Sequence, residues 1–279
     1  MQINFDDINE IISNALEEDI GRGDVTSNLT IPEDANISAK FIFREDAIFC
    51  GTPILENIFL RYSEKIKFIP LVKEGSFVQA SQAVFEVSGN ARIILQSERV
   101  ALNFIQRMSG IATLTNKFVE KTKGTKAQIL DTRKTTPNLR KIERYSVWIG
   151  GGVNHRYCLD DAVLIKDNHI AFNNGDIQKT IRLAKNNAPE GFIIEVECDN
   201  LEQFKIAIQE KPDIILLDNM NINELKQAVE LAKNTNILLE ASGGVTLETI
   251  KEIAETGVDR ISIGSLTHSV KSIDIGLDF

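Results

Sequence analysis

Hydrophobic and polar residues follow several distinct patterns along the chain. At residues 6–18 apolar residues recur at helical spacing, which predicts an amphipathic helix. At 36–43 apolar and polar residues alternate, which predicts a half-buried strand, and further short strands are expected at 46–50, 65–72 and 83–87. Together these strands predict a small antiparallel sheet with one face covered.

Two segments beside this sheet have other patterns. Residues 18–27 are polar and contain Gly21 and Gly23, which predicts a loop. From 93 to 121 the helical spacing returns, and we expect Gly110 to break that helix because glycine is a poor helix former.

Beyond residue 125 apolar runs of strand length alternate with amphipathic stretches. The strands are expected at 128–130, 162–165, 192–196, 214–217, 237–239 and 261–263, and helices at 176–187, 201–209, 223–233 and 247–256. This alternation is typical of parallel strands with helices outside. Because six or seven strands are expected rather than eight, the predicted fold class is α/β with an incomplete parallel (β/α) barrel.

Composition narrows the class of protein. With 43% hydrophobic and 25% charged residues the chain falls in the ordinary globular range. Its net charge of −9 argues against nucleic-acid binding, and no apolar run approaches the roughly 20 residues that cross a membrane. The cysteines are few and widely spaced, and the acidic N-terminal stretch is unlike a targeting peptide, so we expect a cytoplasmic protein.

Polar residues or glycines end nearly every apolar run in the second half of the chain. The carboxyl ends of parallel barrel strands meet at one rim, where active sites lie. Residues 131–169 supply seven Lys/Arg and five Asp/Glu within an otherwise acidic chain. This local balance predicts a confined site for a small anion, although a solvated face is the usual role of mixed charge.

Basic residues follow the first of these strands and a run of glycines. Arg133 and Lys134 supply a planar fork and a point charge, a pair that suits carboxylate or phosphate. Three glycines at 150–152 precede His155 and Arg156, and we expect the backbone there to approach a ligand.

Acidic residues end the next strands. Glu195 and Glu197 are separated by one residue, so their side chains point to the same side of a strand. Asp218 ends the following strand. Carboxylates beside a bound polyphosphate are typically bridged by Mg²⁺, and salt bridges to nearby arginines are the alternative.

A lysine and two glycine-containing loops complete the candidates. Lys166 follows a strand, where a lysine serves as a rim charge, an anion anchor or a Schiff-base nucleophile. The loops 242–244 and 263–265 follow the last two strands, where barrels commonly hold phosphate with backbone N–H groups.

Motifs spread over essentially the whole chain resemble those of the quinolinate phosphoribosyltransferase family, the decarboxylating nicotinate-nucleotide pyrophosphorylases of NAD biosynthesis. They are EDIGRGD at 18–24, SERVALN at 97–103, TRKT at 132–135, GGGVNHR at 150–156, LIKDNH at 164–169, EASGG at 240–244, GSLTHS at 264–269 and DIGLD at 274–278. Two departures are visible: Asn138 stands where the family more often has glycine, and Trp148 lies at a position expected to vary.

The resemblance implies a two-domain subunit that works as a homodimer or larger assembly. Residues 1–113 would form a small N-terminal α/β sandwich, with the tail 270–279 packed back on it, and residues 114–269 the catalytic incomplete barrel. The resemblance also implies that Arg99 is lent by the neighbouring subunit.

Roles for individual residues also come from the resemblance. Those expected to line the dicarboxylate pocket or contact phosphate are Thr132, Arg133, Lys134, His155, Arg156 and Lys166. Glu197 and Asp218 would serve the ribose and the metal. The 5′-phosphate would be held by Ser242, Gly243, Gly244, Ile263, Gly264 and Ser265. The expected catalytic residues are Lys134, Lys166, Glu197 and Asp218.

The expected reaction joins quinolinate to the ribose of phosphoribosyl pyrophosphate, giving nicotinate mononucleotide, CO₂ and pyrophosphate. Mg²⁺ and the cationic side chains would neutralise the leaving pyrophosphate, and the pyridinium formed would accept the electrons left by CO₂. The alternatives are a related transferase for another acid, such as the molybdenum-associated homologues, a Schiff-base aldolase that uses Lys166, and a non-catalytic anion-binding protein.

Overall fold

The computed structural model describes residues 5–62 and 64–279 and divides into two compact units. Of the described residues, the first unit contains 5–62, 64–116, 135–151 and 265–279, and the second contains 117–134 and 152–264. These units differ from the expected domains 1–113 and 114–269 at residues 114–116, 135–151 and 265–269, which all group with the first unit.

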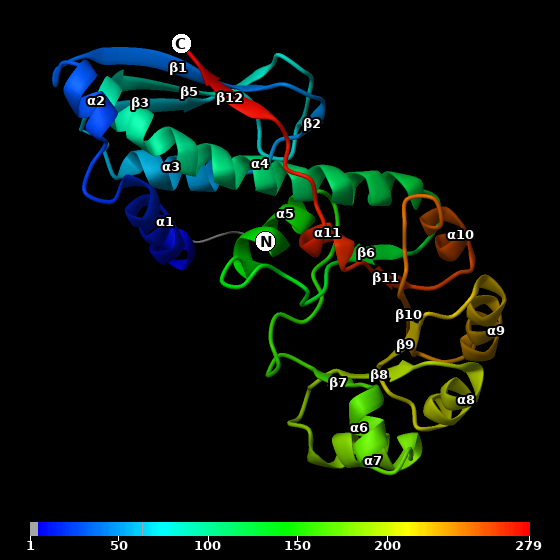
Figure 1. The fold of residues 1–279 in the computed structure, drawn as a ribbon. Coiled ribbons are helices and arrows are strands. Elements are labelled where there is room, and N and C mark those ends of the chain that lie inside the picture. Colours follow the sequence, from blue (N-terminus) through cyan, green and yellow to red (C-terminus); the bar gives the residue numbers. More distant parts are fainter. Residues whose placement is uncertain (1–4, 63) are drawn as a thin grey trace. The chain divides into compact units, whose positions relative to one another are not determined.

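The first unit is built on an antiparallel sheet with the strand order β12-β1-β5-β3. The strands of this unit are β1 (Asn36–Phe43), β2 (Ala47–Ile48), β3 (Ile66–Pro70), β4 (Phe77–Val78), β5 (Ala83–Asn90) and β12 (Ile275–Asp278). One face of the sheet lies over helices α3 and α4 (Figure 1). Phe41, Phe59 and Phe85 are fully buried there and pack ring against ring, so the predicted sheet with one covered face is confirmed.

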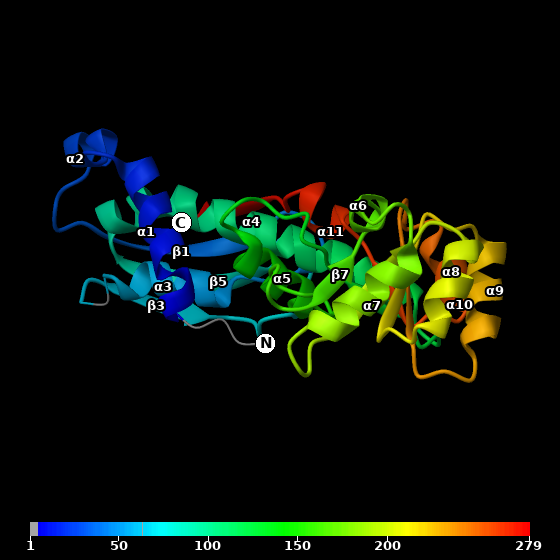
Figure 2. The same cartoon turned by 90° about the horizontal axis from the view of Figure 1, so that it is seen from below.

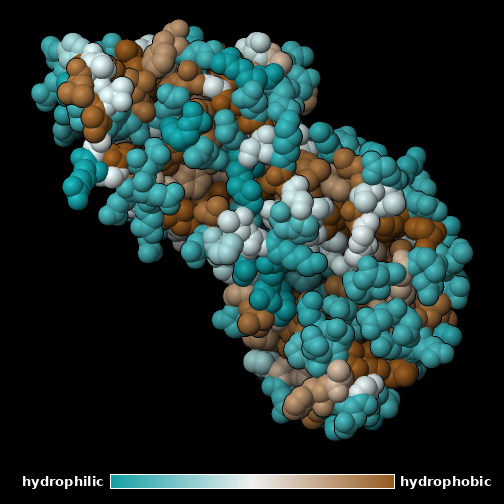
Figure 3. Space-filling view, viewed as in Figure 1, coloured by the Kyte–Doolittle hydropathy of each residue, from teal (hydrophilic) through white to brown (hydrophobic). Residues whose placement is uncertain are grey.

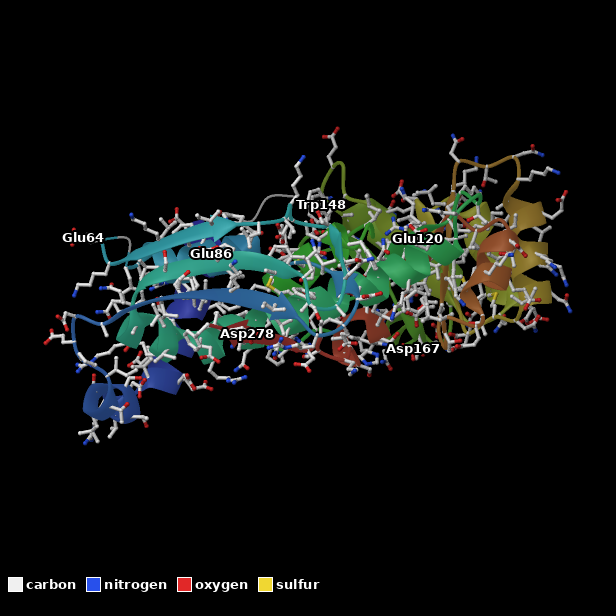
Figure 4. All side chains as sticks on the ribbon, turned by 90° about the horizontal axis from the view of Figure 1, so that it is seen from above. Glu64, Glu86, Glu120, Trp148, Asp167 and Asp278 are labelled. Atoms are coloured by element: carbon white, nitrogen blue, oxygen red, sulfur yellow. The ribbon has the colours of Figure 1, made fainter. Side chains whose placement is uncertain are left out.

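The opposite face of this sheet carries charged residues. Lys40 pairs with Glu86 on β5 at 3.8 Å, and Arg44 donates hydrogen bonds to Asp278 on β12. Figure 4 labels Glu86 and Asp278 on these two strands. Lys40 alternates with the buried Ala39 and Phe41, so the period-two pattern of the sequence sorts the strand between core and solvent.

The helices of the first unit are α1 (Phe5–Ile20), α2 (Val25–Thr30), α3 (Thr52–Leu60), α4 (Ala91–Lys121), α5 (Arg140–Ile149) and α11 (Ser265–His268), with α4 extending into the second unit. The predicted loop at 18–27 is only partly correct: α1 extends to Ile20, and Asp24 caps α2 by accepting a hydrogen bond from the Ser27 amide at 3.0 Å.

Arg107 on α4 ties several of these segments together. Its Nε donates to the buried Glu143 on α5 at 2.8 Å, and its Nη2 donates to Thr136 Oγ1 and to the Thr267 carbonyl at 2.8 and 2.9 Å. Glu143 in turn accepts a hydrogen bond from the Thr136 amide. The segment that follows Lys134 is therefore anchored to α4 by a partly buried ion pair.

The second unit is a six-stranded parallel sheet with the order β6-β11-β10-β9-β8-β7. Its strands are β6 (Gln128–Leu130), β7 (Val163–Ile165), β8 (Ile194–Cys198), β9 (Ile214–Asp218), β10 (Leu238–Ser242) and β11 (Arg260–Ser262). Strands β6 and β7 form the two edges, so the sheet does not close into a ring. The prediction of an incomplete parallel barrel is confirmed.

Helices cover the outside of this sheet. They are α6 (Asp167–Phe172), α7 (Ile177–Asn187), α8 (Leu201–Gln209), α9 (Ile222–Ala232) and α10 (Ile250–Glu255). Helix α7 packs on β7 and β8, and α8 packs on β8 and β9. Figure 2 shows α8, α9 and α10 side by side on the outer side of this unit.

The surface is mixed in character. Hydrophilic residues cover most of the face seen in Figure 3, with smaller hydrophobic areas between them. Among the described residues no helix combines the length and the apolar composition that a membrane span requires.

The expected break at Gly110 is wrong, because α4 is continuous from Ala91 to Lys121. A Cβ atom built on Gly110 would lie 2.3 Å from the Lys271 carbonyl oxygen. Glycine is needed here so that the segment before β12 can lie directly against the helix, and not to end it.

We therefore expect Gly110→Ala to lower the free energy of unfolding by about 1–3 kcal/mol, although alanine is the better helix former. Lys117→Ala, an exposed change on the same helix, is the control and should change it by less than about 0.5 kcal/mol. Chemical denaturation measures both variants. A Gly110→Ala protein as stable as the wild type would contradict the close approach.

Candidate active site at the carboxyl edge of the parallel sheet

The parallel strands bring most of the predicted site residues to one edge of the second unit. Segments 131–134 and 263–264 follow the adjacent strands β6 and β11. Ser242 ends β10 directly beside Asp218, which ends β9, and Glu197 lies on β8 next in order. Lys166 follows the edge strand β7. The side chains gather because all six strands run in the same direction.

Two guanidinium groups lie close together at this edge. Burial, and next the positive charge of Arg133, lower the pKa of Arg156. Arg156 donates a hydrogen bond to the Ala162 carbonyl at 2.9 Å, which fixes its side chain. The Nε of Arg133 is buried without a hydrogen-bond partner among the described residues. Like charges held this close favour an anion between or beside them.

The lysines are more exposed than the arginines. Lys134 is exposed, and its amide donates to Thr132 Oγ1 at 3.1 Å, which tightens the turn after β6. Lys166 lies 3.3 Å from Glu197 Oε2 with nearly half of its side chain exposed. Lys166 is thus both paired with a carboxylate and open to solvent.

Three carboxylates converge beside Lys166. Oxygen atoms of Glu197, Asp199 and Asp218 lie within 4.8 Å of one another. Burial raises the pKa of Glu197, Lys166 acts against this shift, and the charge of Asp218 adds to it. A cluster of oxygen ligands that repel one another suits a hard divalent cation such as Mg²⁺. The predicted pair Glu197 and Asp218 is present, and Asp199 is an additional possible ligand.

His155 lies deeper, between two buried carboxylates. Its Nε2 is 3.3 Å from Glu195 Oε2 and 3.3 Å from Glu240 Oε1. Burial acts to lower the pKa of His155, but the hydrogen bonds and charges of the two carboxylates raise it to about 9. The Arg156 amide, 2.8 Å from Nδ1, favours the uncharged ring, but one amide dipole is weaker than two full charges.

A tight glycine turn follows β10. Gly243 has a φ of +95°, and a Cβ atom there would lie 2.1 Å from Asn219 Oδ1. The Asn219 amide donates to the Ser242 carbonyl at 2.9 Å, so the ends of β9 and β10 are locked together. Gly244 follows with a φ of +59°. Only glycine fits this approach, which leaves backbone rather than side chain at the edge.

Two predicted residues belong to the first unit. Arg99 is exposed on α4, and Ser265 begins α11 immediately after Gly264. Their expected parts in the site remain predictions.

The structure gives reasons other than ligand binding for some of the residues that the sequence analysis singled out. A Cβ atom on Gly150 would lie 2.4 Å from the Ala112 carbonyl, so packing against α4, and not a ligand, requires this glycine. Asn138 has a φ of +66°, which explains why asparagine can stand where glycine is more frequent. Trp148 is partly exposed at the end of α5.

Sequence reasoning left Glu240 and Arg260 without a role and Glu195 undecided. Glu240 is fully buried and lies 2.8 Å from Arg260 Nε. The sequence did contain a signal for two of these residues. Glu195 and Glu240 each precede an assigned residue by two positions on the same strand, so their side chains lie on the same face of the sheet as that residue. A charged residue in the middle of a buried strand always requires a partner.

Comparisons with known proteins agree over the whole chain. A family model described as "Quinolinate phosphoribosyl transferase, N-terminal domain" matches residues 24–109, and one described as "Quinolinate phosphoribosyl transferase, C-terminal domain" matches residues 111–278.

Individual relatives cover nearly the same length. A protein of Methanocaldococcus jannaschii named "Probable nicotinate-nucleotide pyrophosphorylase [carboxylating]" is 42% identical over 277 residues, 96% of each chain. The "Nicotinate-nucleotide pyrophosphorylase [carboxylating]" of Mycobacterium leprae is 40% identical over 98% of each chain. The crystal structure of nicotinate-nucleotide pyrophosphorylase from Ehrlichia chaffeensis has a TM-score of 0.93 at 43% identity, covering 100% of this chain and 99% of that one.

The charge on His155 has a consequence for stability. Since its pKa in the folded protein is raised from 6.5 to about 9, the stabilisation is complete below pH 6.5 and is lost as the pH rises through 9. The difference in unfolding free energy between wild type and His155→Gln should therefore shrink over this interval. Denaturation at several pH values measures it, and a difference independent of pH would contradict the raised pKa.

Proposed function

This chain belongs to the quinolinate phosphoribosyltransferase family, and on that premise we propose that it transfers the phosphoribosyl group of phosphoribosyl pyrophosphate to quinolinate. The reaction releases CO₂ and pyrophosphate and yields nicotinate mononucleotide for NAD biosynthesis. The enzyme is thus a decarboxylating pentosyltransferase. Relatives at about 40% identity over nearly the full chain carry the name of this activity.

The observation that carries the proposal is that two guanidinium groups, those of Arg133 and Arg156, lie near each other at the carboxyl edge of the parallel sheet. The positive charge of Arg133 lowers the pKa of Arg156, so an anion bound beside both groups would offset this repulsion. Quinolinate brings two carboxylates and phosphoribosyl pyrophosphate brings several phosphate charges. We assign Arg133, Arg156 and His155 to the dicarboxylate, with Thr132 and Lys134 beside them on the segment after β6.

The acidic cluster is proposed as the binding place of Mg²⁺ together with the pyrophosphate and ribose. Its oxygen atoms fit this ion because they lie close together, are partly exposed and have no Lys/Arg partner except Lys166 on Glu197 among the described residues. Bound there, the ion supplies charge neutralisation for the pyrophosphate. Glu197 and Asp218 are the proposed ligands.

The protein's own side chains contribute by holding positive charge and the two substrates in suitable positions. Lys134 and Lys166 carry exposed positive charge toward the departing pyrophosphate, so that the bond from ribose C1 breaks with its electron pair on the leaving oxygen. The quinolinate nitrogen forms the new bond to C1. The carboxylate beside that nitrogen leaves as CO₂, its bonding electrons are taken up by the pyridinium ring, and the ring carbon receives a proton.

The 5′-phosphate is assigned to the turns after β10 and β11. Gly243 and Gly244, next to Ser242, offer backbone donors without side-chain bulk, and Ile263 and Gly264 follow the neighbouring strand β11. Ser265 continues this segment.

A Schiff-base aldolase is the weaker candidate. Attack by Lys166 on a carbonyl requires an uncharged amine, whereas the contact with Glu197 at 3.3 Å stabilises the charged ammonium, which has no lone pair to donate. Borohydride reduction with a carbonyl substrate would trap an adduct only in the aldolase.

We also propose that the enzyme works as a homodimer or larger assembly in the cytoplasm, with Arg99 completing the site of the neighbouring subunit. The exposed position of Arg99 on α4 supports its availability to a second chain. The free state of Cys50, Cys158 and Cys198 is compatible with a reducing compartment.

Arg133→Ala and Lys166→Ala should each reduce turnover of quinolinate and phosphoribosyl pyrophosphate by on the order of 100-fold while the protein remains folded. Release of CO₂ and formation of nicotinate mononucleotide measure the rate, and circular dichroism checks the fold. Lys205→Ala, an exposed lysine on α8, is the control and should retain full activity. Wild-type rates in both site variants would remove the assignment.

Removal of Mg²⁺ by a chelator should abolish turnover, and Asp218→Asn should raise the Mg²⁺ concentration for half-maximal rate by about tenfold or more. Calorimetry of phosphoribosyl pyrophosphate binding with and without Mg²⁺ gives a second readout that needs no catalysis. Glu202→Gln on α8 serves as the control. An unchanged Mg²⁺ dependence in Asp218→Asn would place the ion elsewhere.

A further inference from the structure

A layer of buried charges lies among the strands beneath the proposed site. The side chains of Glu195 and Glu240 are 2% and 0% exposed, and that of His155 is 9% exposed between them. Arg260 Nε lies 2.8 Å from Glu240 Oε2. None of these four groups is needed to form a barrel core, which apolar side chains fill at lower cost.

Strand register places this layer one step below the site. Glu240 is beside Arg260 on β11 and shares a face with Ser242, which ends the same strand. Glu195 shares a face with Glu197 in the same way on β8. The layer thus joins segments whose next side chains along the strands belong to the proposed site.

The charges of the layer are balanced. Burial acts to raise the pKa of Glu240, but the hydrogen bond and charge of His155, followed by the charge of Arg260, lower it. Two carboxylates then face one imidazolium and one guanidinium. This balance is what allows ionised groups to remain inside a sheet.

A metal ion is the competing explanation for three of these side chains. Ligand atoms of His155, Glu195 and Glu240 lie within 4.8 Å of one another, a spacing that also suits a metal. Arg260 opposes that occupant, because it already neutralises Glu240 and would repel a cation beside it. The arrangement fits an ion-pair network.

The network holds His155 from one side while Asp131 holds it from the other. The completely buried Asp131 accepts hydrogen bonds from the His155 amide and from Asn154 Nδ2, both at 2.7 Å. The backbone and the ring of His155 are therefore both fixed. Arg156 is the next residue, so its position depends on the same contacts.

We propose that Glu240, supported by Arg260, is a positioning residue: it clamps the His155 ring from beneath and so sets where His155 and Arg156 present positive charge to the dicarboxylate. Glu240 itself contacts no substrate. The identity of that dicarboxylate rests on the proposed function, whereas the clamp on His155 does not. Glu195 is the second arm of the clamp.

The test is Glu240→Gln, which keeps the shape of the side chain and removes its charge. We expect the KM for quinolinate to rise by about tenfold or more, because the negative charge that lies 3.3 Å from His155 Nε2 is lost. The KM for phosphoribosyl pyrophosphate should stay near the wild-type value. The matched control is Glu210→Gln, which removes a carboxylate bound to Arg182 away from this layer and should change neither KM.

A double-mutant cycle distinguishes an effect of Glu240 through His155 from a general disruption of the site. If Glu240 acts through His155, adding Glu240→Gln to His155→Ala should raise the quinolinate KM no further than His155→Ala alone. Additive effects would mean that Glu240 acts by another route and would overturn the proposal.

NMR of the His155 ring supplies a readout that needs no turnover, and its first measurement needs only the wild-type protein. In the wild type the ring should titrate above its ordinary pKa of 6.5, with a slowly exchanging Nε2 proton. In Glu240→Gln the titration should shift downward. A wild-type ring that titrates at or below 6.5 overturns the clamp even when Glu240→Gln does not fold.

The outcomes for the clamp and for the proposed function are distinct. An inactive wild type whose His155 ring titrates as expected would remove quinolinate as the substrate and leave the clamp supported. An active wild type with an unchanged quinolinate KM and an unchanged His155 titration in Glu240→Gln would overturn the clamp and leave the function supported.

Discussion

The buried strands of a parallel sheet require apolar residues, whereas the carboxyl ends of the same strands in this protein carry charged residues. The arrangement of the second unit follows from these two requirements. Each of its strands is covered by helices outside and by side chains inside, so most of its residues must be apolar. All six strands nevertheless end at the same edge, and there the chain places Lys166, Asp218 and the segment after β6. Groups of opposite sign from distant parts of the sequence are thereby brought within contact distance.

The charged side chains of this sheet lie at two depths, at the carboxyl edge of the strands and in a buried layer beneath that edge. At the edge Glu197 keeps an exposed lysine beside it and two neighbouring carboxylates, so its charge is only partly compensated. Below the edge Glu240 has no exposure and is compensated by His155 and Arg260. The partly compensated layer is the one suited to binding ions and anions, and the balanced layer beneath gives it a fixed base.

Helices with a strong local sequence pattern were predicted more accurately than those with a weak pattern. Helix α8 lies at the predicted residues 201–209, because its apolar spacing and the Asn200 cap agree. Helices α2, α6 and α11 have six residues or fewer and were not predicted, because so few residues give too little periodicity. Helices α3 and α5 were also missed although they are longer. Gly110 was misread because a glycine that admits a neighbouring chain has the same sequence signal as one that ends a helix.

The alternation of strands and helices, the polar ends of the strands and the motifs of the family could all be read from the chain alone, since each of these is encoded in consecutive residues. Which buried charges meet one another depends instead on the folded sheet. His155, Glu195, Glu240 and Arg260 lie far apart along the chain, and their pairing follows from strand order and register. Strand order arises from packing of the whole sheet, which no local window of residues contains.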